Sequence, residues 1–316
     1  MRNALSNRAD TAFRVGAVGL LAAAMCSLAW NQFGSVLARD WLSYAIAIAL
    51  LAAGLLLSGR AQRPAGPALG CVVGLLLLAG WDALSLRWSA VPALARDEAL
   101  LVIFYALLFI VPILVLRGEG ERRLATTLVV AGLVTLALAT FAHLLVTERP
   151  TDYYDYGRLT FPISYVNAQA ALFLVGFWPC VALAARRAAQ PLLRAVAIGG
   201  ATALLAGWLM TQSKGGGVAL IASGIVLFAL SPERLRAVLP ALIPAAFVGG
   251  AYGPLTRPYR ERGATDFAAA IHSASWTALA LVGLERPWVA PTRTATVVFP
   301  SLHERNALSP FHSRLL

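Results

Sequence analysis

The chain has 316 residues, of which 59% are hydrophobic and 13% are charged, and its formal net charge is +11. Soluble domains carry about 25% charged residues, so this composition excludes an ordinary soluble protein. The positive charge does not indicate nucleic-acid binding here, because basic residues in cytoplasmic loops orient membrane proteins.

Apolar runs of membrane-spanning length follow one another along the chain. A helix needs roughly 20 mostly apolar residues to cross a bilayer, where its backbone groups must be satisfied internally. The sequence therefore predicts an all-α, polytopic transmembrane bundle with nine or ten spans, forming one domain over residues 1–284. The runs lie near 13–31, 41–58, 69–86, 99–116, 124–146, 166–184, 193–211, 214–231 and 236–253, with a weaker tenth at 266–284.

The first run has basic residues before an apolar core, as a signal peptide does. No small-x-small site followed by a soluble chain comes after it, so we expect an uncleaved first span. The three cysteines, Cys26, Cys71 and Cys180, lie inside apolar runs without CxxC spacing. This pattern favours packing residues over a disulfide or a metal site.

The loops predict the orientation of the bundle. With a cytoplasmic N-terminus, the inner loops hold more Arg and Lys than the outer loops, as the positive-inside rule requires. Residues 147–165 then form the longest polar loop of the first 250 residues, and they lie on the external side. Arg158 stands in this loop, where topology alone does not explain an arginine.

A second polar stretch opens a later apolar run on the same side. In "TQSKGGGVAL", residues 211–220, Ser213 stands at a helix cap position and is followed by Lys214 and three glycines. A capped helix start with bare amides attracts anions, and Lys214 adds a full charge. A nucleotide-binding P-loop is excluded because its GxxxxGK[ST] order is absent.

Both helix starts, near Val166 and near Lys214, point their positive dipole ends outward, so Arg158 and Lys214 are predicted to face the same anion. A diphosphate suits them, since arginine offers a bidentate fork and lysine a compact charge. A second interpretation stays open. The two cations would then be interfacial anchors that extend toward lipid headgroups, and the glycines would only permit close helix packing.

Four further polar residues are candidates for supporting or alternative roles. Asp82 is the only acid within the nine stronger predicted spans, and we expect it to pair with a neighbouring helix more readily than to act in catalysis. Asn167 can cap the helix that follows Arg158. Tyr165 suits the membrane interface by default, with stacking against a sugar ring as the alternative. For His143 we favour packing or hydrogen bonding over catalysis.

Three segments resemble the family of O-antigen ligases and the related O-antigen polymerases. They are "RWSAVPALARDEALLVIFYALLF" at 87–109, "GRLTFPISYVNAQAALFLVGFWP" at 157–179 and "TQSKGGGVALIASGIVLFAL" at 211–230. The family shows a W-S-x-x-P stretch before a span, then R-L-x-x-P-x-x-Y-x-N-A and T-x-S-R-G stretches that each enter a helix. The likeness extends over roughly residues 15 to 284, and the motifs occur in the family's order.

The resemblance implies a multi-pass enzyme of the bacterial inner membrane. It would transfer a glycan, with inversion, from an undecaprenyl-pyrophosphate donor to an acceptor hydroxyl on the external face. The reaction would need no metal, cofactor or nucleic acid, and the acceptor is unknown. Pyrophosphate binding carries over to Arg158, and to Lys214 with a lysine where the family prefers arginine.

The late part of the chain departs from the family. The family has a large external loop with a histidine thought to activate the acceptor, whereas "PLTRPYRERGAT" at 254–265 is short and His272 lacks the family's H-N-x-x-L context. We assign no catalytic base. Residues 285–316 form an irregular tail. It is either a disordered cytoplasmic segment or, as we favour, out-of-frame coding that replaced the catalytic loop and the last helices. In the second case the chain would retain part of the donor-binding chamber and be deficient in catalysis.

A non-enzymatic membrane protein or transporter is the alternative function. It would call for polar residues at mid-bilayer depth along several spans. The predicted spans have few such groups apart from Asp82, so this function ranks second.

Overall fold

The structure is a computed structural model of the chain. It describes residues 15–24, 26–27, 30, 38–59, 64–116, 118–187, 189–231, 234–262 and 266–284. The predicted tail at 285–316 lies outside the described residues, and so do parts of the first predicted span.

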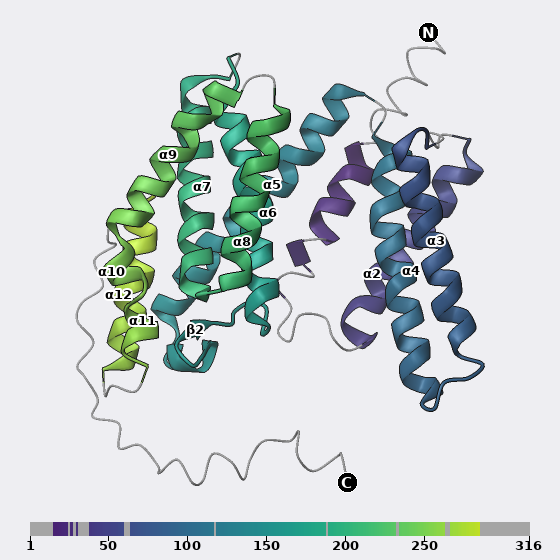
Figure 1. Ribbon diagram of the computed structural model, residues 1–316, viewed down its shortest axis with the longest axis horizontal. Coiled ribbons are helices and arrows are strands. Elements are labelled where there is room, and N and C mark those ends of the chain that lie inside the picture. The colour runs from purple at the N-terminus through teal and green to yellow at the C-terminus, as the bar shows by residue number, and fades with distance from the viewer. Residues whose placement is uncertain are drawn as a thin grey trace. The chain divides into compact units, whose positions relative to one another are not determined.

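The described residues are almost entirely helical, which confirms the predicted all-α class (Figure 1). A helix covers Val15–Ala24. The labelled helices are α2 (Ala38–Leu57), α3 (Pro67–Ser85), α4 (Pro92–Val115), α5 (Glu119–Val146), α6 (Val166–Ala185), α7 (Pro191–Thr211), α8 (Lys214–Leu230), α9 (Arg234–Gly250), α10 (Tyr252–Leu255), α11 (Arg257–Arg260) and α12 (Phe267–Ala280). A 3₁₀ turn, η1 (Pro150–Tyr153), and two short strands, β1 (Tyr154–Asp155) and β2 (Arg158–Leu159), connect α5 to α6.

Six of the described helices, α2 to α7, are long and apolar enough to cross a membrane. Three later helices are shorter: α8 and α9 have 17 residues each and α12 has 14. At 1.5 Å per residue, 17 residues span about 26 Å, slightly less than the roughly 30 Å of a bilayer core. The length and composition of these helices agree with an all-α membrane bundle, and the number of spans and their orientation stay predictions.

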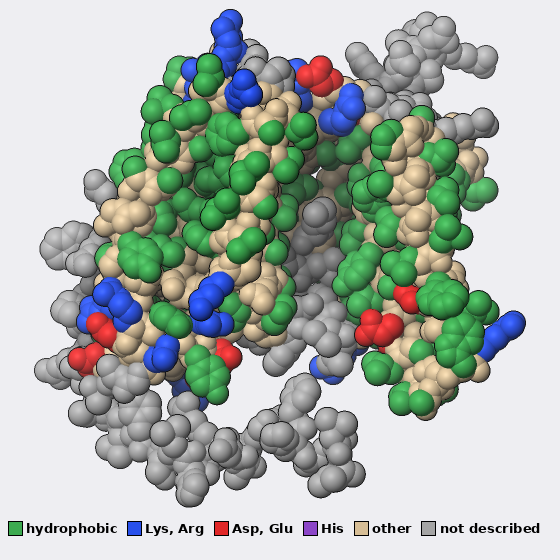
Figure 2. Space-filling view, in the orientation of Figure 1, with side chains coloured by type: hydrophobic (Ala, Val, Ile, Leu, Met, Phe, Trp, Pro, Cys, Tyr) green, Lys and Arg blue, Asp and Glu red, His purple; other side chains and the backbone are tan. Residues whose placement is uncertain are grey.

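Hydrophobic and charged side chains separate along the helices (Figure 2). Lys, Arg, Asp and Glu side chains gather toward the helix ends, and hydrophobic side chains cover the middle. Many large hydrophobic side chains on these helices are exposed, among them Leu77, Ile221 and Leu239, which are 65–70% exposed. An apolar outer surface of this kind is what a lipid-facing bundle requires.

The buried side chains form two hydrophobic clusters. One joins the helix Val15–Ala24 to α2 and α4, and α3 packs on α4. The other joins α5, α6, α7, α9 and α12. Its centre includes Phe141 and Phe173, which are fully buried.

Glycines let α6 and α7 approach closely. A Cβ added at Gly207 of α7 would lie 2.9 Å from the Phe173 ring of α6, and one at Gly176 of α6 would lie 2.8 Å from Leu204 of α7. Small residues at helix contacts are typical of membrane bundles. This tight pair holds the start of α6 beside the end of α7, and the candidate site lies at these two helix ends.

A two-residue hairpin projects between α5 and α6. Tyr154 pairs with Leu159 and Asp155 with Arg158, in antiparallel register. The two residues of its turn, Tyr156 and Gly157, both have positive φ, at 47° and 76°. This is the pattern of a type I′ turn, which suits the twist of a hairpin and favours glycine at its second position.

Candidate anion-binding site

The helices α5 to α12 share one end that we call the polar end, made of residues 147–167, 211–216 and 251–262. Here α5 and α9 finish while α6 and α8 begin. The sequence predicts that this end is external. Contacts between the hairpin and α11 place the loop 147–165 on the same side as the segment 251–262, as the predicted topology requires.

Ser213 caps α8, as the sequence predicted for its position. Its side chain is buried and accepts a hydrogen bond from the Gly216 amide at 3.0 Å. The amides of Lys214 and Gly215, at the first two helical positions, have no partner within the helix. They are the backbone donors that the start of α8 offers to an anion.

Asn167 does not cap α6, so the predicted cap was wrong. The cap position is Tyr165, without a side-chain hydrogen bond to the helix. Asn167 instead lies in the first turn. It accepts a hydrogen bond from Ser213 Oγ at 2.8 Å through Oδ1 and donates to the Tyr165 hydroxyl at 3.0 Å through Nδ2. These two bonds join the start of α6 to the start of α8.

The glycines after Lys214 make room for a tryptophan. A Cβ at Gly216 would lie 2.6 Å from Nε1 of Trp208 and 3.1 Å from the Ala170 Cβ. Trp208 Nε1 has no hydrogen-bond partner among the described residues. At Gly216 the packing explanation that the sequence left open therefore holds, and it is compatible with the anion-binding role of the same turn.

Lys214 is exposed, and its ammonium makes no hydrogen bond or ion pair with any residue in the described part of the chain. Its charge is therefore not neutralised by a described carboxylate. Because Ser213 tethers this turn to Asn167, the position of the Lys214 backbone is fixed relative to the start of α6.

Arg158 lies on β2 and is half-buried. The hairpin that carries it touches α11 at Gly157, where a Cβ would lie 2.7 Å from the Pro258 carbonyl oxygen and 2.8 Å from the Tyr259 Cα. Hydrogen bonding and positive charge from Arg262, and then from Arg158, lower the pKa of the Tyr259 phenol. Arg158 therefore faces Tyr259, a neighbour that the sequence did not predict.

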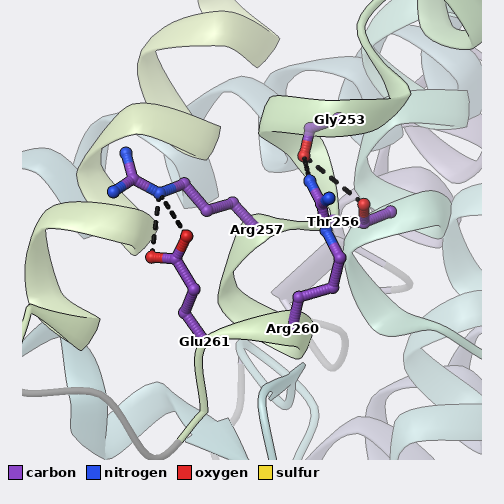
Figure 3. A network of polar contacts seen from close by, with 5 residues as sticks. All are labelled: Gly253, Thr256, Arg257, Arg260 and Glu261. Carbon is purple, nitrogen blue, oxygen red and sulfur yellow. Dashed lines mark hydrogen bonds and ion pairs between the residues drawn. The ribbon is translucent and has the colours of Figure 1, made fainter.

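The α11 segment carries three more arginines, and two of them are bound to other groups of their own segment (Figure 3). Arg257 Nε contacts both carboxylate oxygens of Glu261, at 2.9 and 3.0 Å. Arg260 donates to the carbonyl of Gly253, which also lies 3.4 Å from the Thr256 hydroxyl. The third, Arg262, places its Cζ 5.0 Å from the centre of the Tyr259 ring.

Arg158 and Lys214 both belong to the polar end of the same helical group. The strand β2 packs on α6 and α7. Ser213, the cap of α8, lies two residues after the end of α7. Asp82 does not join them: it is half-buried on α3, which packs on α4. Its side chain makes no hydrogen bond or ion pair with the described residues, so the expected pairing with a neighbouring helix is not observed.

An apolar groove runs along α6 and α8 from the polar end. It is lined at its start by Asn167, Gly215 and Gly216. Farther along it is lined by Ala171, Leu174, Val175, Ala219, Trp178 and Ser223. Trp178 Nε1 donates to Ser223 Oγ at 2.8 Å, which joins its two walls.

The two histidines of interest are packed in the structure. His143 stacks on Phe161 with ring centres 4.8 Å apart and contacts Tyr153 edge-on at 5.0 Å. His272 is half-buried in α12. The described residues contain no group of three His, Cys, Asp or Glu side chains that could hold a metal ion.

Comparison with protein-family models, with curated proteins and with solved structures finds no match to this chain.

Proposed function

We propose that this chain is a membrane glycosyl ligase of the O-antigen ligase and polymerase type. It would bind an undecaprenyl-pyrophosphate-linked glycan at the external face of the bacterial inner membrane. The observation that carries the proposal is the junction at the polar end. There Asn167 and Ser213 tie two helix starts together, next to Lys214, which has no ion pair with the described residues, and on the side that carries Arg158.

The chemistry of the donor explains why cations are needed there. When an acceptor hydroxyl attacks the anomeric carbon, a new C–O bond forms and the bond to the pyrophosphate oxygen breaks. The pyrophosphate then leaves with additional negative charge. Fixed positive groups stabilise such a leaving group. Arg158 supplies a bidentate fork, Lys214 a point charge, and the amides of Lys214 and Gly215 further donors.

The groove along α6 and α8 supports the lipid part of the proposal. Its first lining residues, Asn167, Gly215 and Gly216, belong to the polar end, and it continues over apolar residues to Trp178. A polyprenyl chain placed there would keep its diphosphate beside the start of α8. With α6 crossing the bilayer, this groove would lie at the depth of the lipid tails.

Donor retention tests this proposal without requiring an acceptor or a catalytic base. The purified protein in nanodiscs is incubated with undecaprenyl-pyrophosphate glycan, and the bound fraction is measured for wild type and for Arg158→Ala. We expect Arg158→Ala to abolish retention while the protein still inserts.

The matched control is Arg87→Ala, which removes an exposed arginine of the loop between α3 and α4. We expect this control to retain the donor as wild type does. Retention by Arg158→Ala at the wild-type level would rule out the proposed site.

A further inference from the structure

The hairpin and α11 form a contact that we call the clasp, made of Gly157, Arg158, Tyr259 and Arg262. These residues are about a hundred positions apart in the chain, and Gly157 brings them together. A Cβ at Gly157 would lie 3.1 Å from the Cβ of Arg262 and even closer to the α11 backbone. The glycine therefore allows a contact that no other residue type would fit without a shift.

Two guanidinium groups of the clasp differ from their neighbours in having no acidic partner within the described part of the chain. Arg257 is paired with Glu261, and Arg260 is bound to the Gly253 carbonyl (Figure 3). Arg158 and Arg262 make no ion pair with a carboxylate among the described residues. Instead, hydrogen bonding and positive charge from both groups lower the pKa of the Tyr259 phenol.

A cation pair beside a hydroxyl donor is suited to a phosphate ester. Each guanidinium can donate two parallel hydrogen bonds to phosphate oxygens, and the Tyr259 hydroxyl can donate a further one. The tyrosine ring already lies under Arg262, with 5.0 Å between Cζ and the ring centre. This cation–π contact holds the Arg262 guanidinium at one side of the phenol.

We propose that Arg262 and Tyr259 complete the donor site, so that the diphosphate is bound between Arg158 on the hairpin and Arg262 after α11. This inference rests on the proposed function and adds two binding residues to it. The two arginines come from separate segments, and an anion between them would link the segments. Donor binding would therefore stabilise the clasp.

The titration of Tyr259 reports on the occupancy of the clasp. The two guanidinium groups lower the pKa of the phenol in the free protein. A bound diphosphate offsets their positive charge and accepts the phenol hydrogen, so the pKa of Tyr259 rises when the anion binds.

The test uses the full-length protein in nanodiscs of neutral phosphatidylcholine, with undecaprenyl diphosphate or inorganic pyrophosphate as the probe. A charge-assisted hydrogen bond contributes about 1.5–3 kcal/mol, so Arg262→Gln is expected to weaken binding of either probe by about tenfold or more. Tyr259→Phe is expected to weaken it less. In wild type, inorganic pyrophosphate shifts the phenolate absorbance of Tyr259 to higher pH.

The control is Arg234→Gln at the start of α9, an exposed arginine at the opposite end of the same helical group. It removes the same charge and is expected to bind both probes as wild type does. Repeating the measurement with phosphatidylglycerol tests the other source of phosphate. Occupation of the clasp by these headgroups alone, with neither probe displacing them, would overturn the proposal.

The outcomes separate the two proposals. If Arg158→Ala loses the donor and Arg262→Gln does not, the clasp is overturned and the proposed function stands. If neither variant loses the donor, both are overturned. Loss in both variants, together with the shift of Tyr259, supports both.

Discussion

Removing the Ser213 hydroxyl tests the junction between α6 and α8. In Ser213→Ala the Gly216 amide loses its cap at 3.0 Å, and Asn167 Oδ1 loses its donor at 2.8 Å. Ser213 is 4% exposed, so water replaces these partners poorly. The variant is expected to be less stable and to loosen the start of α8.

The two bonds set the magnitude of the loss. Replacing a serine cap by alanine costs about 1 kcal/mol. A hydrogen bond between neutral side chains adds about 1 kcal/mol. The free energy of unfolding should therefore fall by about 2 kcal/mol in total. Ser213→Thr keeps a hydroxyl and should recover most of this loss.

A double-mutant cycle isolates the bond to Asn167. Unfolding in mixed micelles with increasing SDS is followed for Ser213→Ala, Asn167→Ala and the double variant. The cycle should give a coupling free energy of about 1 kcal/mol. A matched cycle of Asn167→Ala with Ser223→Ala, farther along α8, should be additive. A coupling between Ser213 and Asn167 below about 0.3 kcal/mol would refute the junction.

Three further predictions concern the clasp and the groove. Gly157→Ala forces a side chain onto a backbone with φ of 76° and against the Pro258 carbonyl. The left-handed conformation alone costs about 1–2 kcal/mol. The variant should therefore unfold at a lower SDS content, and the clasp should open. Ala219→Trp fills the groove along α6 and α8, so it should weaken binding of undecaprenyl diphosphate in a retention assay and leave inorganic pyrophosphate binding unchanged; equal effects on both probes would contradict the groove's role. The pKa of Tyr259 is lowered in the folded protein, so its phenolate should add to the free energy of unfolding as pH rises through the folded pKa, and should add nothing below it. In Arg262→Gln the phenol should titrate at higher pH. An unchanged titration would contradict the contact between Arg262 and Tyr259.

The helices were predictable because apolar runs of this length have few alternatives in a membrane. Several begin earlier than their apolar core, and α3, α4 and α7 begin at Pro67, Pro92 and Pro191. Proline is favoured at the first helical position, where its missing amide hydrogen is not needed. A prediction based on hydropathy alone therefore places these starts too late.

The site was predictable where it depended on local sequence. The cap by Ser213 follows from a serine before a helix start. The partner of Asn167 does not, since it lies 46 residues away and depends on how α6 and α8 pack. The clasp was missed for the same reason. Its signal in the sequence was Gly157 in a two-residue turn, which marks a hairpin without indicating what the hairpin contacts.

Binding of undecaprenyl diphosphate by Arg158→Ala, Lys214→Ala and the double variant tests the central claim most directly. If the two cations hold one diphosphate, each single variant should bind about tenfold or more weakly than wild type in the same nanodiscs. Their combined effect should be smaller than the sum of the two, because the remaining cation can no longer hold the anion in its bound geometry. Binding at the wild-type level by either single variant would contradict the claim.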